Sequence, residues 1–175
     1  MTKLLSTEQM AEFANSGCLF FEGLIDEDIN KEFLNDIGHT DIDDVDNIQH
    51  YFQNIKSSSS IPRIPAGTAL KDAYPLNSPL EKIFKNEIVS GAINSLVGSK
   101  TVVDHQFLHL TFPSKYYAKA NQRQMSQVNH QDSTIDPRTT FDIQLFYFPT
   151  AVTKEMGGTR YIPGTHLRIV NEMGI

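Results

Sequence analysis

The chain has 175 residues, of which 39% are hydrophobic and 21% are charged, and its formal net charge at pH 7 is −6. This length and mix predict one globular domain with a sizeable core. Without a basic stripe, the sequence argues against nucleic acid or an anionic membrane surface as a partner. Cys18 is the only cysteine, so no disulfide can form within the chain. No apolar run approaches the roughly 18 residues of a membrane span, and the N-terminus has too short an apolar core for a secretory signal. We therefore expect a cytoplasmic protein.

The N-terminal part predicts helices. Ser6 and Gln9 form the capping-box pattern S-x-x-Q, which predicts a helix over residues 6–17 that ends at a glycine. The stretch CLFFEGLI (18–25) predicts a short buried strand, and Asp26 can cap a second helix. The apolar face expected for that second helix consists of Ile29, Phe33, Leu34 and Ile37.

The acidic run at 40–47 and the serine- and proline-rich stretch at 56–67 predict loops, and no helix or strand is assigned over 40–75. The acidic run lacks the carboxylate spacing and the glycine of a calcium loop, so we expect it to be solvated. Ser78, Pro79 and Glu81 mark the start of another helix. The apolar residues that follow at helical spacing are Ile88, Val89, Ala92, Ile93, Leu96 and Val97.

The second half of the chain is rich in β-branched and aromatic residues. Three segments predict strands: 101–112, 141–149 and 159–163. Because helices come first and strands later, we expect an α+β fold with helices packed outside a sheet or barrel. The whole chain, 1–175, is then a single domain, with a helical part over roughly 1–98 and strands over roughly 101–175.

His130 and Asp132 stand two residues apart in the polar stretch SQVNHQDSTID. In an extended segment alternate side chains point the same way, so an imidazole and a carboxylate can meet at one point. A second histidine from elsewhere would complete the two-His, one-carboxylate set of non-haem Fe(II) oxygenases, which leaves coordination positions open. The alternative interpretation is a chance pattern in which Asp132 only forms a turn.

The expected strand at 141–149 has two unlike faces. One face carries Asp142, Gln144, Phe146 and Phe148, and the other carries Phe141, Ile143, Leu145 and Tyr147. The mixed polar and aromatic face either lines a pocket or is simply the solvated side of a sheet. His105 and His109 alternate along the 101–112 segment, and they either reach such a pocket or form hydrogen bonds within the sheet.

The order of these motifs resembles the phytanoyl-CoA dioxygenase family. The resemblance lies in NHQD, a following strand, GGTRYIPGTH, and the opening STEQMAEFANSGCLFFEGLIDEDI, and it is densest over 1–37 and 128–168. It implies a double-stranded β-helix, or jelly roll, and an oxygenase that depends on Fe(II) and 2-oxoglutarate.

Residue by residue, the resemblance implies that His130 and Asp132 are the first two iron ligands. Gln131 matches a position that touches the cosubstrate region in some members, and Phe146 falls where members often carry an aromatic residue beside the 2-oxoglutarate pocket. His166 matches a structural turn, PGTH, and is not expected to be a ligand. A carboxylate at Asp132 favours hydroxylation, because related halogenases carry a small residue there.

The sequence departs from the family after this turn. The family's distal histidine and its 2-oxoglutarate-binding arginine lie some tens of residues further on, whereas only LRIVNEMGI follows His166. Arg168 comes too soon after the turn to match that arginine. We therefore expect an incomplete jelly roll, with the distal ligands beyond this sequence.

Three hypotheses remain open at this stage. The first is a dioxygenase that hydroxylates a small organic substrate, or the N-terminal portion of one. The second is a non-catalytic jelly-roll module with a partial metal site. The third, a metal-dependent hydrolase, requires a general base and a closed ligand set that the sequence does not offer. The substrate and the oligomeric state are not predicted.

Overall fold

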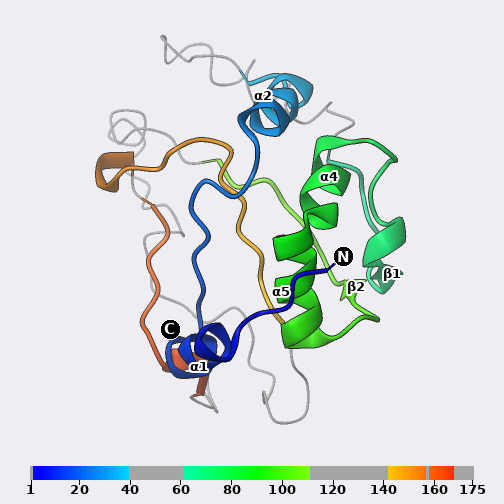
Figure 1. The fold of residues 1–175 in the computed structure, drawn as a ribbon. Helices are drawn as coiled ribbons and strands as arrows, with labels where there is room; N and C mark the ends of the chain where they lie inside the picture. The colour runs from blue at the N-terminus through cyan, green and yellow to red at the C-terminus, as the bar shows by residue number, and fades with distance from the viewer. Residues whose placement is uncertain (1, 40–60, 111–141, 157, 168–175) are drawn as a thin grey trace, which may run out of the picture. The chain divides into compact units, whose positions relative to one another are not determined.

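The computed structural model describes residues 2–39, 61–110, 142–156 and 158–167 (Figure 1). The chain divides into two compact units: the first takes residues from 1–5, 21–109 and 146–151, and the second takes the rest. In chain order the elements are α1 (Thr7–Ser16), α2 (Glu27–Asp36), β1 (Thr68–Ala69), η2 (Leu70–Asp72), α4 (Pro79–Lys85), α5 (Glu87–Val97), β2 (Val102–Val103), η4 (Lys154–Met156) and η5 (Thr165–Leu167). Across these ranges, no helix is long and apolar enough to cross a membrane.

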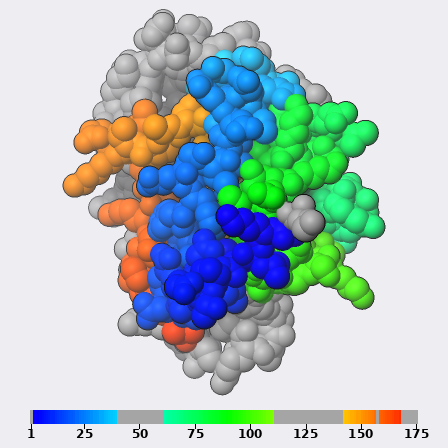
Figure 2. Space-filling model, viewed as in Figure 1, coloured from blue at the N-terminus to red at the C-terminus, as the bar shows by residue number. Residues whose placement is uncertain are grey.

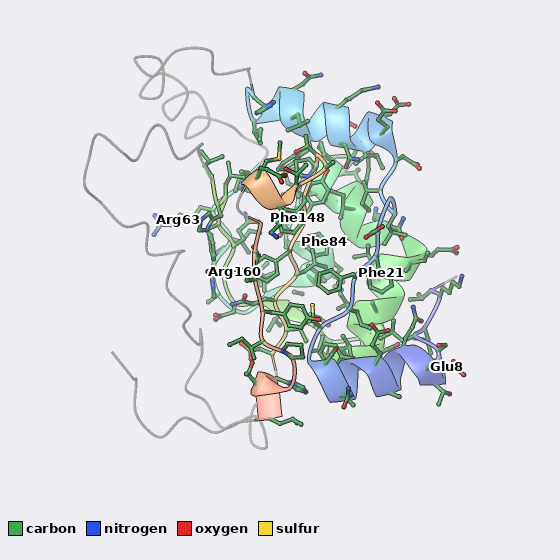
Figure 3. The ribbon with its side chains drawn as sticks, turned by 90° about the vertical axis from the view of Figure 1, so that its left-hand side faces the viewer. Glu8, Phe21, Arg63, Phe84, Phe148 and Arg160 are labelled. Carbon is green, nitrogen blue, oxygen red and sulfur yellow. The ribbon has the colours of Figure 1, made fainter. Side chains whose placement is uncertain are left out.

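Helix α1, in the second unit, begins and ends as the sequence predicts. Ser6 Oγ accepts a hydrogen bond from the Gln9 N–H (3.2 Å), and Gln9 Oε1 accepts one from the Ser6 N–H (3.0 Å). This reciprocal pair confirms the capping box. Glu8, in the first turn, extends away from the helix into solvent (Figure 3). The helix ends at Gly17, whose φ of 81° is left-handed and whose N–H donates to Phe13 O.

The first unit packs α2 against α4 and α4 against α5. Two residues of the predicted apolar face of α2, Phe33 and Ile37, are only 4% and 3% exposed. Asp26 precedes α2 as predicted, although its side chain makes no capping hydrogen bond. The buried hydrophobic residues of this core are Phe33, Ile37, Ala73, Ile83, Val89, Ala92 and Ile93.

The expected helical stretch after Ser78 is two helices separated at Asn86. Asn86 has an extended backbone (φ −53°, ψ 131°), and its Oδ1 accepts hydrogen bonds from the N–H groups of Ile88 and Val89. Asparagine is among the strongest N-cap residues, so it starts a new helix where the apolar periodicity alone suggests continuity.

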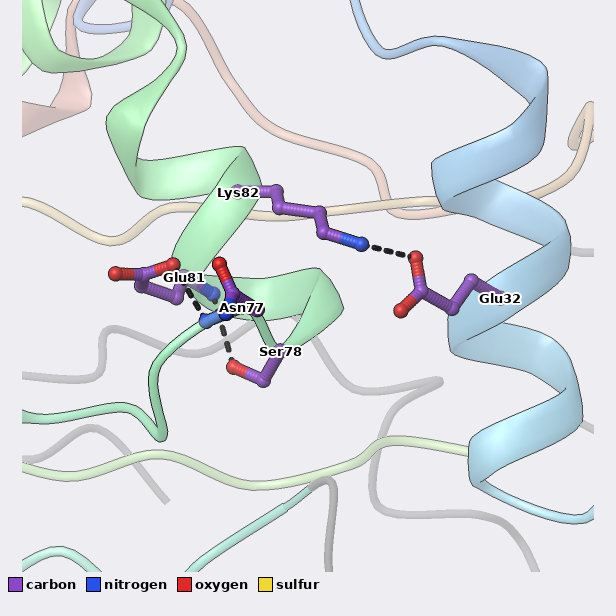
Figure 4. A network of polar contacts seen from close by, with 5 residues as sticks. All are labelled: Glu32, Asn77, Ser78, Glu81 and Lys82. Atoms are coloured by element: carbon purple, nitrogen blue, oxygen red, sulfur yellow. Dashed lines mark hydrogen bonds and ion pairs between the residues drawn. The ribbon is translucent and has the colours of Figure 1, made fainter.

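Polar contacts fix the start of α4 (Figure 4). Ser78 Oγ accepts the Glu81 N–H at 3.3 Å, which confirms the predicted cap. Glu81 Oε2 accepts the N–H of Asn77, whose φ is 64°, and Glu81 also pairs with Lys85. Hydrogen bonding from Lys85 lowers the pKa of Glu81. Lys82 reaches across to Glu32 of α2 at 2.5 Å; both side chains are partly exposed, so this pair contributes little to stability.

The strand predictions are largely wrong for the described residues. The one sheet there has two short antiparallel strands, with Thr68 opposite Val103 and Ala69 opposite Val102. The predicted strand at 101–112 is therefore correct only at β2. Residues 18–25 form no strand but turn at Gly23, and 142–148 and 158–162 form none either. Alternating apolar and polar residues favour an extended backbone. A strand also requires a neighbouring segment to which its backbone can hydrogen-bond. The predicted jelly roll is not confirmed by these residues.

The N-terminal segment lies across α5 in the first unit. The Lys3 N–H donates to Glu87 O and the Leu5 N–H donates to Ser95 Oγ, both at 3.0 Å. Between these contacts the Lys3 carbonyl lies so close to Gly91 that a Cβ on this glycine would overlap its oxygen. Figure 2 shows the dark-blue segment directly against the green atoms of this region. Gly91 therefore permits a main chain to pack directly on a helix.

Replacing Ser95 by alanine should lower the free energy of unfolding by about 1 kcal/mol, because the part-buried Leu5 N–H loses its acceptor. Ser90→Ala is the matched control on the same helix, since Ser90 Oγ donates only to Glu87 O in an exposed position. Urea unfolding and hydrogen exchange of the Leu5 amide measure the effect. Equal losses in the two variants would contradict a specific role for the Leu5–Ser95 bond.

Candidate functional site

Of the residues predicted for the site, only one lies within the described part of the chain. His130, Gln131 and Asp132 lie outside the described residues. Phe146 is described, and its side chain is 57% exposed. The structure therefore shows the surroundings of Phe146. For the predicted metal ligands, the sequence gives only the chemical type of each side chain.

Phe146 projects outward because the next residue is anchored inward. Tyr147 Oη donates to Asn30 Oδ1 of α2 at 2.6 Å, and its ring packs edge-on against Phe33, with 5.2 Å between the ring centroids. In an extended segment the residues on either side of Tyr147 point the opposite way. The exposed rings of Phe146 and Phe148 stack nearly parallel, 6.5 Å apart at an interplanar angle of 9°.

A second extended segment of the first unit is held in the same manner. Tyr74 Oη donates to Gln106 Oε1 at 2.9 Å, and Gln106 Nε2 donates to the Pro62 carbonyl. The Tyr74 ring stacks on Phe84 of α4 at 4.9 Å and 15°, and Phe84 is labelled in Figure 3. Gln106 is thereby fixed on the inner side of its segment.

The residues that alternate with Gln106 form an exposed row of rings. His105 and Phe107 stack at 5.9 Å and 6°, and Phe107 lies 6.3 Å from His109. His105 Nδ1 is 2.8 Å from an oxygen of Asp104, and both side chains are exposed. His105 thus pairs with a neighbouring carboxylate on the surface. One interpretation of the sequence predicted instead that His105 forms hydrogen bonds within the sheet.

Burial raises the pKa of Tyr74 and of Tyr147 to about 12. In each case the low-dielectric surroundings disfavour the phenolate. Both hydroxyls therefore stay protonated near neutral pH and act as donors, to Gln106 and to Asn30 respectively. Sequence patterns did not single out these two tyrosines, because their role depends on partners 32 and 117 residues away.

His166 lies in the turn that the sequence predicts. The chain turns at Pro163 and Gly164 and enters η5, with the Thr165 N–H donating to Ile162 O at 3.3 Å. His166 Nε2 lies 3.1 Å from Ala14 O of α1, in the same unit. Its ring is therefore in contact with a helix end.

Within the described ranges, no group of three or more His, Cys, Asp or Glu side chains could hold a metal ion. An imidazole nitrogen and a carboxylate oxygen are both ordinary ligands of Fe(II). The side chains of His130 and Asp132 in the NHQD motif are therefore of the right chemical type to bind Fe(II).

Tyr147→Phe should lower the free energy of unfolding by about 1 kcal/mol, because it removes the hydrogen bond to Asn30 and keeps the ring on Phe33. Tyr161→Phe is the matched control, since that ring is 46% exposed and packs on Phe20. Chemical unfolding of both variants measures the difference. A loss no greater than that of the control would show that the Tyr147 hydroxyl does not anchor the segment.

Stability should fall as the pH rises from 10 to about 12. The unfolded chain ionises its tyrosines near pH 10, whereas Tyr74 and Tyr147 ionise only near pH 12 in the folded state, so base favours unfolding across this window. Their contribution is fully present below pH 10. Urea unfolding against pH measures the slope, which the Tyr74→Phe, Tyr147→Phe double variant should reduce. An unchanged slope in that variant would assign the effect to other groups.

Comparison with known proteins identifies a family. The family model described as phytanoyl-CoA dioxygenase (PhyH) matches residues 13–174, which is most of the chain. No curated protein and no solved structure matches the sequence significantly. The matched range includes the NHQD motif, Phe146 and the PGTH turn. Members are typically oxygenases that depend on Fe(II) and 2-oxoglutarate. The chain belongs to the phytanoyl-CoA dioxygenase family.

Proposed function

We propose that this chain carries all or part of an Fe(II)- and 2-oxoglutarate-dependent dioxygenase that hydroxylates a small organic substrate. The observation that carries the proposal is the family match over residues 13–174, which encloses an intact His-x-Asp motif at His130 and Asp132. The fold proposed with it is the family's double-stranded β-helix.

His130 and Asp132 are the proposed protein ligands of the iron. Their imidazole and carboxylate would hold the ion and would leave other coordination positions open. Iron, 2-oxoglutarate and oxygen together supply the oxidising chemistry when bound. Asp132 would place a carboxylate where related halogenases leave room for a halide, so the proposed outcome is hydroxylation.

Gln131 and Phe146 are the proposed contacts to the cosubstrate. Phe146 is supported by its surroundings, because the Tyr147–Asn30 bond orients it outward and its ring is 57% exposed. An aromatic ring outside the core can cover the apolar part of a bound molecule and exclude water from it. Its stacking partner Phe148 restricts the ring's orientation.

The substrate is proposed only as a small organic molecule. The residues Lys115, Lys119 and Arg123 precede the NHQD motif but form no dense basic cluster in the sequence. The sequence therefore gives no particular support to a coenzyme A thioester, whose phosphates would require several cations.

Anaerobic titration with Fe(II) and then 2-oxoglutarate tests the proposal. We expect a visible charge-transfer band from the chelate, which is lost in His130→Ala and in Asp132→Ala. Matched controls are His105→Ala and Asp104→Ala, which remove an exposed imidazole–carboxylate pair outside the motif. Under air, a chain that also carries the family's distal histidine and arginine should consume 2-oxoglutarate slowly without substrate, and its Asp132→Ala variant should not.

A band that persists in both motif variants would contradict the ligand assignment. No band from the folded chain would contradict iron and cosubstrate binding by this chain alone. Circular dichroism of each variant separates loss of the site from loss of the fold.

A further inference from the structure

The C-terminal end of α1 is completed by the PGTH turn, which lies about 150 residues further along the chain. A helix leaves its last four carbonyls without partners from the helix itself. Here Phe13 O accepts from the Gly17 N–H at 2.7 Å, and Ser16 O accepts from the Gly164 N–H at 2.9 Å. Ala14 O lies 3.1 Å from His166 Nε2. Three of the four carbonyls thus have a partner, and the turn supplies two of them.

The two ring nitrogens of His166 have different surroundings, which indicate one tautomer. A carbonyl oxygen can only accept, so the contact with Ala14 O requires the proton on Nε2. Nδ1 is buried and has no hydrogen-bond partner among the described residues. An Nδ1–H would leave a donor without an acceptor there and would remove the donor that Ala14 O needs.

Gly17 provides the space for this ring. Its φ of +81° already favours glycine, and a Cβ built on it would overlap Nδ1 and lie 2.7 Å from Cγ of His166. Phe13 lies on α1 with its ring centroid 6.4 Å from that of His166. The imidazole therefore lies against the Gly17 backbone and near the Phe13 ring of α1.

We propose that His166 is a positioning residue that caps α1 through its Nε2–H and that this contact withholds both ring nitrogens from metal. A metal ligand needs a lone pair directed at open space. Nε2 is occupied by the Ala14 carbonyl, and Nδ1 is buried against Gly17. His166 then cannot complete the ligand set of His130 and Asp132. The statement about metal rests on the proposed function, whereas the capping role does not.

Nitrogen-15 NMR of the His166 ring, at a pH where it is neutral, tests the tautomer directly. We expect the shifts of an Nε2–H imidazole with a deprotonated Nδ1. The exposed His105, paired through Nδ1 with Asp104, is an internal comparison. An Nδ1–H tautomer at His166, or rapid averaging of the two forms, would overturn the proposal.

A double-mutant cycle between Gly17 and His166 tests the packing. Gly17→Ala should reduce the folding equilibrium constant about tenfold more than Gly23→Ala. Gly23 also has a positive φ, of +62°, and no described atom lies within 4 Å of the point that a Cβ on it would occupy. Adding His166→Ala should remove most of that excess, because the overlap disappears. Additive effects of the two substitutions would overturn the proposed contact.

Conservative variants separate capping from simple packing. His166→Gln keeps an N–H donor, whereas His166→Phe keeps a ring and has none. We expect slow exchange of the Gly17 and Gly164 amides to be retained better in His166→Gln than in His166→Phe. The opposite order would show that the ring, and not the hydrogen bond, holds the turn.

The iron titration separates this inference from the proposed function. If the wild-type chain gives the chelate band, His166→Ala should give it too, at the same Fe(II) affinity. Loss of the band in both His166→Ala and Asp132→Ala would make His166 a ligand and overturn the inference, while the proposed function would stand. If the wild-type chain gives no band but the Gly17–His166 cycle shows coupling, the capping role of His166 would stand and the proposed function would be overturned.

Discussion

The constraint on which most of this structure depends is that the backbone groups at the ends of short helices must find partners. Helix α4 has 7 residues, α1 has 10 and α5 has 11, so a large share of their N–H and C=O groups lie at an end. Such helices are marginal alone in water and need capping and packing. Side chains provide the N-terminal partners at Ser6, Ser78 and Asn86. At the C-terminal ends, the N–H groups of Gly17, Asn86 and Gly98 donate to α1, α4 and α5, and the PGTH turn supplies further partners for α1.

Side-chain hydrogen bonds connect the helical part of the first unit to the segments that carry candidate function. In the first unit, two half-buried tyrosines use their hydroxyls to hold extended chain, one on Gln106 and one on Asn30. A fixed inner residue turns its neighbours outward, and this exposes the rings of Phe107 and Phe146. The outward aromatic residues are thus a consequence of polar contacts on the inner side, and they remain available for a ligand because the core does not use them.

The parts that the sequence predicts well are those with a local cause. The ends of α1 follow from a capping box and a glycine within a 12-residue stretch, and the buried face of α2 follows from helical spacing. The strand predictions at 18–25, 141–149 and 159–163 are wrong within the described residues because alternation does not provide a pairing partner. The break between the two helices at Asn86 does have a local signal, because asparagine is a strong capping residue. The apolar periodicity continues across this point and predicts one helix instead. For the site, the motif at His130 and Asp132 stays a prediction, while the anchors Tyr74 and Tyr147 needed the tertiary contacts to be seen.

His166 shows why residue type and order along the chain do not determine a ligand. A histidine downstream of a His-x-Asp motif is the right type of residue for a third ligand. An imidazole can bind a metal, however, only through a free lone pair. A ring nitrogen that donates its proton to a helix carbonyl has no lone pair to offer, and breaking that contact would leave Ala14 O without its donor. Gly17 adds a steric condition, because only a residue without a Cβ leaves room for the ring. The glycine that ends α1 and the histidine that ends the PGTH turn therefore constrain each other, and a change at either position has to be judged with both in view.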